Sequence, residues 1–93
     1  NEKAGVFSIV LECIQTQVAK EITQTLKIPT IGIGASNYCD GQILVTDDML
    51  GLSGFYPRFV KKFLRLDNII EKGVQKYNKE VITKKFPYKK NTF

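Results

Sequence analysis

Histidine and tryptophan are absent from the 93-residue chain, and cysteine occurs only at Cys13 and Cys39. Without histidine there can be no histidine-based catalytic triad and no histidine-ligated metal, which excludes most hydrolase mechanisms. Two distant cysteines outside a Cys-x-x-Cys motif predict neither a zinc site nor a disulfide scaffold. We therefore interpret both as packed thiols in a protein of the reducing cytoplasm.

Long apolar runs are also missing. The longest, VFSIVL at 6–11, is far shorter than the roughly 20 residues of a membrane helix, so we expect no membrane partner. The length fits one domain, because a typical domain has about 100–150 residues. The chain begins at Asn1 and its only methionine is Met49, so we expect it to be a piece of a longer protein.

Charge is distributed unevenly along the chain. Residues 58–93 hold eleven basic and three acidic side chains, a net charge of +8, whereas residues 1–57 carry −3. The lysines recur at helical intervals between apolar residues, which is typical of a solvated helix face. No nucleic-acid-binding signature is present, so we expect no nucleic-acid partner. The alternative is a small basic binding module for nucleic acid or an anionic surface, whose affinity would fall steeply with salt.

The hydrophobic pattern alternates between strand and helix. Apolar or β-branched runs predict three strands, at 6–11, 28–34 and 42–46. Apolar residues at helical spacing predict helices at 16–27, 57–66 and 68–84, with Thr16 and Asn68 as N-caps and a loose tail at 87–93. This order predicts an α/β fold with a parallel sheet. Such a sheet needs helices on both faces or a closed barrel, and the chain has too few elements for either.

In parallel α/β folds, functional groups gather at the carboxyl ends of the strands. Glu12 follows the first predicted strand directly. A carboxylate at the end of an apolar strand is partly desolvated, which suits it to proton transfer. The alternative is a surface acid paired with a lysine such as Lys20.

Two other strand ends carry weaker signals. Gly32 and Gly34 lie in an IGIGA run that could hold an anion. The run lacks the third glycine of a dinucleotide-binding loop, and close backbone packing explains it better. Asp47 and Asp48 follow the third predicted strand and are candidates for Mg²⁺ binding. Adjacent residues on a strand point to opposite faces, so without a turn they would not converge on one ion.

Several blocks along the chain, in order, resemble the ketopantoate hydroxymethyltransferase family. They are VLEC at 10–13, AKEIT at 19–23, IPTIGIGA at 28–35, CDGQILV at 39–45, DMLGL at 48–52, Pro57-x-Phe59-Val60-Lys61 and Phe86-Pro87. The resemblance runs over nearly all of the chain.

The resemblance implies a (β/α)₈ TIM-type barrel of about 250 residues, of which this chain would be the C-terminal third, about three of eight βα units. Family enzymes transfer a hydroxymethyl group from 5,10-methylenetetrahydrofolate to 3-methyl-2-oxobutanoate, giving ketopantoate for pantothenate synthesis. A Mg²⁺ ion binds this keto acid and stabilises its enolate. A glutamate in the VLEC block accepts the proton, and that role falls on Glu12.

The family's metal-binding acids and its substrate-contacting lysine belong to the first two thirds, so the resemblance assigns no metal or cofactor ligand to this chain. The chain has Gln15 where the family has proline, Ser36 where it has glycine, and Asp47 where it has histidine. We therefore expect residues 1–93 to be an incomplete barrel segment, inactive alone. A complementary N-terminal fragment or a second copy of the chain would be its partner.

Overall fold

A three-stranded parallel sheet lies at the N-terminal end of the chain. The structure is a computed structural model and describes residues 2–93. The strands stand in the order β1 (Ile9–Glu12), β2 (Thr30–Ile33) and β3 (Gly41–Gln42). The expected parallel α/β arrangement is confirmed. All three strands are shorter than predicted, and β3 has two residues, of which only Gln42 lies in the predicted range 42–46.

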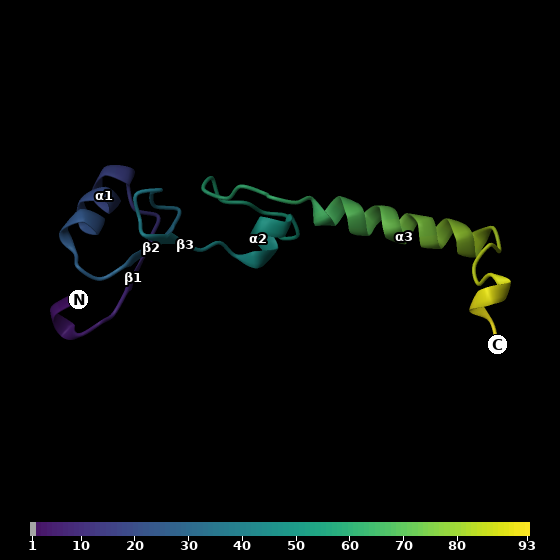
Figure 1. Cartoon of the computed structure of the whole chain (residues 1–93). Helices are drawn as coiled ribbons and strands as arrows, with labels where there is room; N and C mark the ends of the chain where they lie inside the picture. Colours follow the sequence, from purple (N-terminus) through teal and green to yellow (C-terminus); the bar gives the residue numbers. More distant parts are fainter. Residues whose placement is uncertain (1) are drawn as a thin grey trace.

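One helix covers one face of this sheet (Figure 1). Helix α1 (Thr16–Thr25) links β1 to β2, and Ala19 packs with Leu11 and Cys39 in a small core. Side chains alternate along a strand, so Val10 and Glu12 lie on the opposite face, which none of the helices within residues 2–93 covers. Thr16 is the first helical residue and not the predicted cap, because Gln15 occupies that position.

A buried hydroxyl joins the carboxyl-terminal part of α1 to the starts of β2 and β3. Thr30 is fully buried at the start of β2, and its Oγ1 lies 2.8 Å from Thr23 Oγ1 on α1. Asp40, just before β3, accepts a 2.8 Å hydrogen bond from the Thr30 backbone N–H and a 3.3 Å one from its hydroxyl. The Asp40 N–H donates back to Thr30 Oγ1 at 3.3 Å. These bonds join α1, β2 and the approach to β3.

The middle of the chain differs most from the prediction. A short helix, α2 (Thr46–Leu50), stands where a strand end and a loop were expected. The helix predicted at 57–66 is wrong, since these residues form turns and bends. The N–H groups of Phe63 and Leu64 donate instead to the carbonyl of Met49, at 2.9 and 3.3 Å. The segment from Gly51 to Leu64 is therefore a loop that returns to the end of α2.

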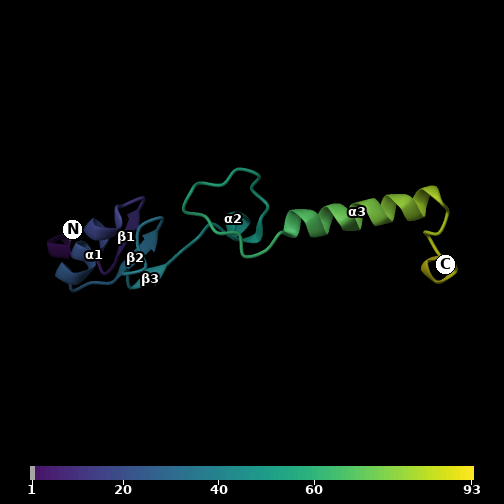
Figure 2. The ribbon, with the colours of Figure 1, turned by 90° about the horizontal axis from the view of Figure 1, so that it is seen from above.

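The last helix, α3 (Leu66–Ile82), projects away from the sheet and leads to a short 3-10 turn at Lys89–Asn91 (Figures 1 and 2). It begins two residues before the predicted cap, Asn68. Arg65 and Asp67 form an exposed ion pair of 3.2 Å at its start. None of its residues is buried. The apolar side chains predicted to form a stripe are exposed, with Val74 61% accessible.

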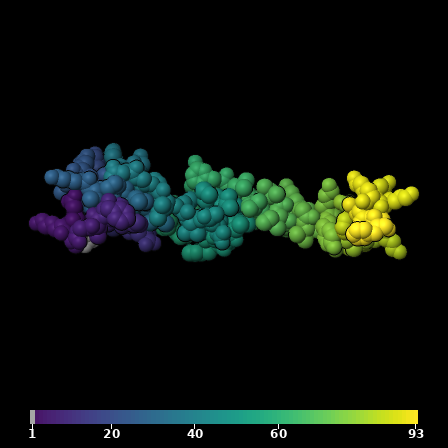
Figure 3. Space-filling model, turned by 60° about the horizontal axis from the view of Figure 1, so that its bottom comes forward, coloured from purple at the N-terminus to yellow at the C-terminus, as the bar shows by residue number. Residues whose placement is uncertain are grey.

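The molecule is elongated, and its N-terminal sheet and C-terminal turn lie at opposite ends (Figure 3). Its extents are 67 × 28 × 16 Å and its radius of gyration is 22.1 Å. A compact chain of this length would have a radius of about 12 Å. Within residues 2–93, no helix is long and apolar enough to cross a membrane.

Candidate active site at the carboxyl ends of the strands

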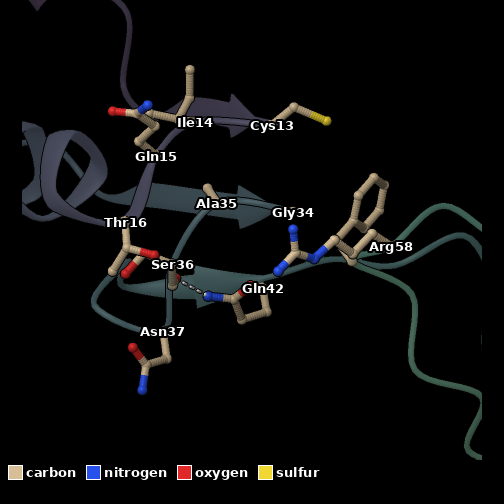
Figure 4. Close-up of a pocket in the computed structure, with 11 residues that line it drawn as sticks. Cys13, Ile14, Gln15, Thr16, Gly34, Ala35, Ser36, Asn37, Gln42 and Arg58 are labelled. Atoms are coloured by element: carbon tan, nitrogen blue, oxygen red, sulfur yellow. Dashed lines mark hydrogen bonds between the residues drawn. The ribbon is translucent and has the colours of Figure 1, made fainter.

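A hollow of about 680 Å³ opens at the carboxyl ends of β1 and β2 (Figure 4). Its walls come from the turn after β1, the loop between β2 and β3, and the returning loop before α3. The lining residues are Cys13, Ile14, Gln15, Thr16, Gly34, Ala35, Ser36, Asn37, Gln42, Arg58 and Phe59. Chain segments distant in sequence therefore meet at the edge of the sheet where parallel α/β proteins place their sites.

The loop after β2 is held to β3 by one side chain. Gln42 Nε2 donates a 2.6 Å hydrogen bond to the Ser36 carbonyl, which also accepts the Cys39 N–H at 3.3 Å (Figure 4). The Ser36 hydroxyl accepts the Tyr38 N–H at 3.1 Å. Ser36 is buried, so its polar groups have partners within the protein. The wall of the hollow is thereby fixed in shape.

The two glycines of the IGIGA run are needed for close packing. A Cβ on Gly32 would lie 3.1 Å from Cys39 Sγ and 3.2 Å from the Gln42 side chain. A Cβ on Gly34 would lie 2.6 Å from the Phe59 ring, and the φ of Gly34 is +63°. Both observations support the packing interpretation of this run over anion binding.

Glu12 ends β1 on the face that α1 leaves uncovered. Its Cα is paired with that of Ile33, so the two side chains share this face. Glu12 is exposed and does not line the hollow, which begins at the next residue, Cys13. The expected partial desolvation is therefore not present in this chain. Glu12 is therefore a surface acid, as in the alternative interpretation, but it forms no ion pair with Lys20. The Lys20 ammonium lies instead 4.5 Å from the centre of the Tyr38 ring.

The two cysteines differ in their surroundings. Cys39 is buried in the core, as expected for a packed thiol, but Cys13 is exposed, which corrects the interpretation made for both. Cys13 has φ +53°, an unusual conformation for a residue with a side chain. Its N–H donates to the Ile33 carbonyl at 3.0 Å. The sharp turn after Glu12 therefore starts while β1 is still bonded to β2.

Asp47 and Asp48 lie in the first turn of α2 and not on a strand. The Asp48 carboxylate accepts a hydrogen bond from Ser53, and the Asp47 carbonyl accepts one from the Leu52 N–H at 2.8 Å. Residues 2–93 bring together no group of three or more histidine, cysteine, aspartate or glutamate side chains that could hold a metal ion. The described side chains therefore do not by themselves form a Mg²⁺ site.

Gln42, Arg58 and Phe59 belong to the hollow but were not singled out in the sequence as site residues. Gln42 and Phe59 lie within blocks that carry the family resemblance, CDGQILV and Pro57-x-Phe59-Val60-Lys61, and that position was the available signal for them. Arg58 stands at the unspecified position of the second block, so the resemblance gave no signal for it. Among the described residues that line the hollow, Arg58 is the only charged one.

Comparison with known proteins supports the resemblance. A family model described as ketopantoate hydroxymethyltransferase matches residues 1–89. The 3-methyl-2-oxobutanoate hydroxymethyltransferase of Pelagibacter ubique is 55% identical over 92 residues, which cover 99% of this chain and 36% of the relative. That of Clostridium botulinum (strain 657 / Type Ba4) is 55% identical over 93 residues, covering 99% and 34%. That of Anaplasma marginale (strain Florida) is 56% identical over 85 residues, covering 91% and 31%.

The chain spans about a third of the length of these curated relatives. The match includes the basic residues after Arg58, so it does not favour the alternative of a separate basic binding module. Because the family model covers nearly the whole sequence, the chain belongs to the ketopantoate hydroxymethyltransferase family.

Proposed function

We propose that this chain is the C-terminal third of a (β/α)₈ barrel that transfers a hydroxymethyl group from 5,10-methylenetetrahydrofolate to 3-methyl-2-oxobutanoate. Family membership and the parallel β1–β2–β3 sheet support this proposal. The free thiols Cys13 and Cys39 suit a reducing compartment, so we place the reaction in the cytoplasm.

The main observation that supports the proposal is the position of Glu12 at the end of β1. In a (β/α)₈ barrel, the helices lie outside, and the sheet face turned away from them forms the interior. Helix α1 packs on the Leu11 side of the sheet, so the Glu12 side corresponds to the interior. Glu12 is also the last residue of its strand, at the barrel end where active sites of this fold lie.

We assign Glu12 the role of general base. Its carboxylate would take a proton from the carbon next to the ketone of 3-methyl-2-oxobutanoate. The resulting enolate would then form a carbon–carbon bond to the methylene carbon of the donor. The bonds from that carbon to the two folate nitrogens would break, water would supply the hydroxyl oxygen, and tetrahydrofolate would leave with the two protons, one from the keto acid and one from water. Val10, Ile31 and Ile33 lie on the same sheet face as Glu12, so its neighbours on that face are apolar. Once further strands cover this face, loss of water makes a carboxylate a stronger base.

The remaining groups for the reaction would come from another segment. The side chains of residues 2–93 do not fit a metal site, so no step proposed here uses a metal held by this chain. The accessible surface is 7718 Å², against about 5,400 Å² for a compact protein of this mass. This excess supports a partner that supplies the missing strands, either a complementary N-terminal segment or a second copy of the chain.

Reconstitution tests the assignment of Glu12. The chain is mixed with the segment of the Pelagibacter ubique relative that it does not match, and ketopantoate formation is measured with both substrates and Mg²⁺. We expect no turnover from the chain alone and turnover from the mixture. Glu12→Gln removes the base but keeps the shape, and should lower the rate by about 10²–10⁴-fold.

Glu21→Gln is the matched control, because Glu21 is an exposed acid on α1, on the other side of the sheet. It should leave the rate unchanged. Turnover by the chain alone would contradict the proposed incomplete site. Equal rates for Glu12→Gln and Glu21→Gln would contradict the role of Glu12.

A further inference from the structure

Arg58 is held at the mouth of the hollow by its neighbours. The Val60 N–H donates to the Pro57 carbonyl at 3.0 Å, which closes a turn around Arg58 and Phe59. The Phe59 ring lies against Gly34 so closely that no side chain fits between them. This contact anchors the turn on the loop after β2, so the Arg58 backbone has a defined place beside the hollow (Figure 4).

Within residues 2–93, the charge of Arg58 is not paired in a salt bridge. Within the described part of the chain, the ion pair formed by an arginine is that of Arg65 with Asp67, outside the hollow. Arg58 is exposed and is the only charged residue in a lining that otherwise offers neutral polar groups, including Thr16, Ser36 and Asn37. A single cation facing neutral donors is suited to an anion, and a guanidinium can bind a carboxylate with two parallel hydrogen bonds.

We propose that Arg58 binds a substrate carboxylate in this hollow. The choice of substrate rests on the proposed function, in which both reactants are carboxylates. 3-Methyl-2-oxobutanoate carries one beside its ketone, and the folate donor carries its own in the glutamate tail. The chemistry that Arg58 recognises is common to both, and the two sources are separable by experiment.

Binding is measured on the full chain by NMR titration, without turnover. The probes are 3-methyl-2-oxobutanoate, N-(4-aminobenzoyl)glutamate as the folate tail, and the uncharged ketone 3-methylbutan-2-one. Arg58→Gln should weaken binding of one of the two acids by about three- to tenfold, as expected for an exposed ion pair. Arg58→Lys, which keeps the charge, should recover part of the loss. The ketone should bind the Arg58→Gln variant and the unsubstituted chain equally.

Arg65→Gln is the matched control, because Arg65 is the other arginine of the chain and lies outside the hollow. It should not change the affinity of either acid. The acid that loses affinity in Arg58→Gln identifies the source of the carboxylate. Absence of binding to the unsubstituted chain would overturn the proposal. So would an Arg58→Gln variant that binds each acid with the same affinity as the unsubstituted chain. If the acids bind as expected but the reconstituted mixture has no turnover, only the proposed reaction fails.

Discussion

Replacing Gly34 by alanine should separate the returning loop from the sheet. The new Cβ would lie 2.6 Å from Cγ and Cδ2 of Phe59, so the ring would have to move by about 0.8 Å to reach the 3.4 Å of ordinary contact. Overpacking of this kind costs about 1–3 kcal/mol. The φ of +63° adds about 1–2 kcal/mol for any residue with a Cβ, whether or not Phe59 is present.

A double-mutant cycle distinguishes these two costs. We expect Gly34→Ala to lower the free energy of unfolding by about 2–5 kcal/mol in the unsubstituted chain. In the Phe59→Ala background, only the backbone cost of about 1–2 kcal/mol should remain. Urea unfolding followed by circular dichroism gives the four free energies. A Gly34→Ala cost that is the same in both backgrounds would refute the contact, and with it the anchoring of Arg58 at the hollow.

Two further substitutions test other parts of the fold. Thr30→Val keeps the side-chain shape but leaves polar groups of Thr23 and Asp40 without their buried partner, so it should lower the free energy of unfolding by about 1–3 kcal/mol. Thr30→Ser keeps the hydroxyl and should lose less; an equal loss would contradict the hydrogen-bond account. The Arg65 side chain, followed by the Asn68 N–H, lowers the pKa of Asp67, so its contribution to α3 is present above the ordinary aspartate pKa of about 4 and lost as pH falls through the lower folded value. Circular dichroism should show helix content falling with acidification in the unsubstituted chain and less pH dependence in Asp67→Asn, and identical profiles would contradict this.

Strands β1 and β2 could be predicted from the sequence because they lie in apolar or β-branched runs separated by a helix of clear period. Strand β3 is only Gly41–Gln42 and follows β2 through a loop, so the predicted strand at 42–46 matched it poorly. The helix expected at 57–66 shows where periodicity alone fails. Its apolar residues do recur at helical spacing, but helices of this length depend on tertiary packing for most of their stability. Here Phe59 packs on Gly34, and the Phe63 and Leu64 N–H groups bond to Met49 instead. Both contacts lie across the chain and leave no local signal.

The candidate site was also predicted only in part from the sequence. The place of Glu12 at the end of a strand followed from the hydrophobic pattern, since the run that precedes it ends there. The other walls of the hollow could not be predicted from local sequence. The Gln42 side chain donates a hydrogen bond to the Ser36 carbonyl. Arg58 lies in a loop whose position depends on the contact of its neighbour Phe59 with Gly34, more than twenty residues earlier. Such contacts follow from the fold and not from the residues beside them.

The most direct test concerns whether the 10.5 kDa chain completes its sheet with strands it does not carry. Equimolar mixing with the unmatched segment of the Pelagibacter ubique relative, followed by size-exclusion chromatography with light scattering, gives the mass of any complex. We predict a one-to-one complex with a smaller radius per unit mass than the chain alone. A chain that remains a compact monomer, with a radius of gyration near 12 Å and no association, would contradict the central claim.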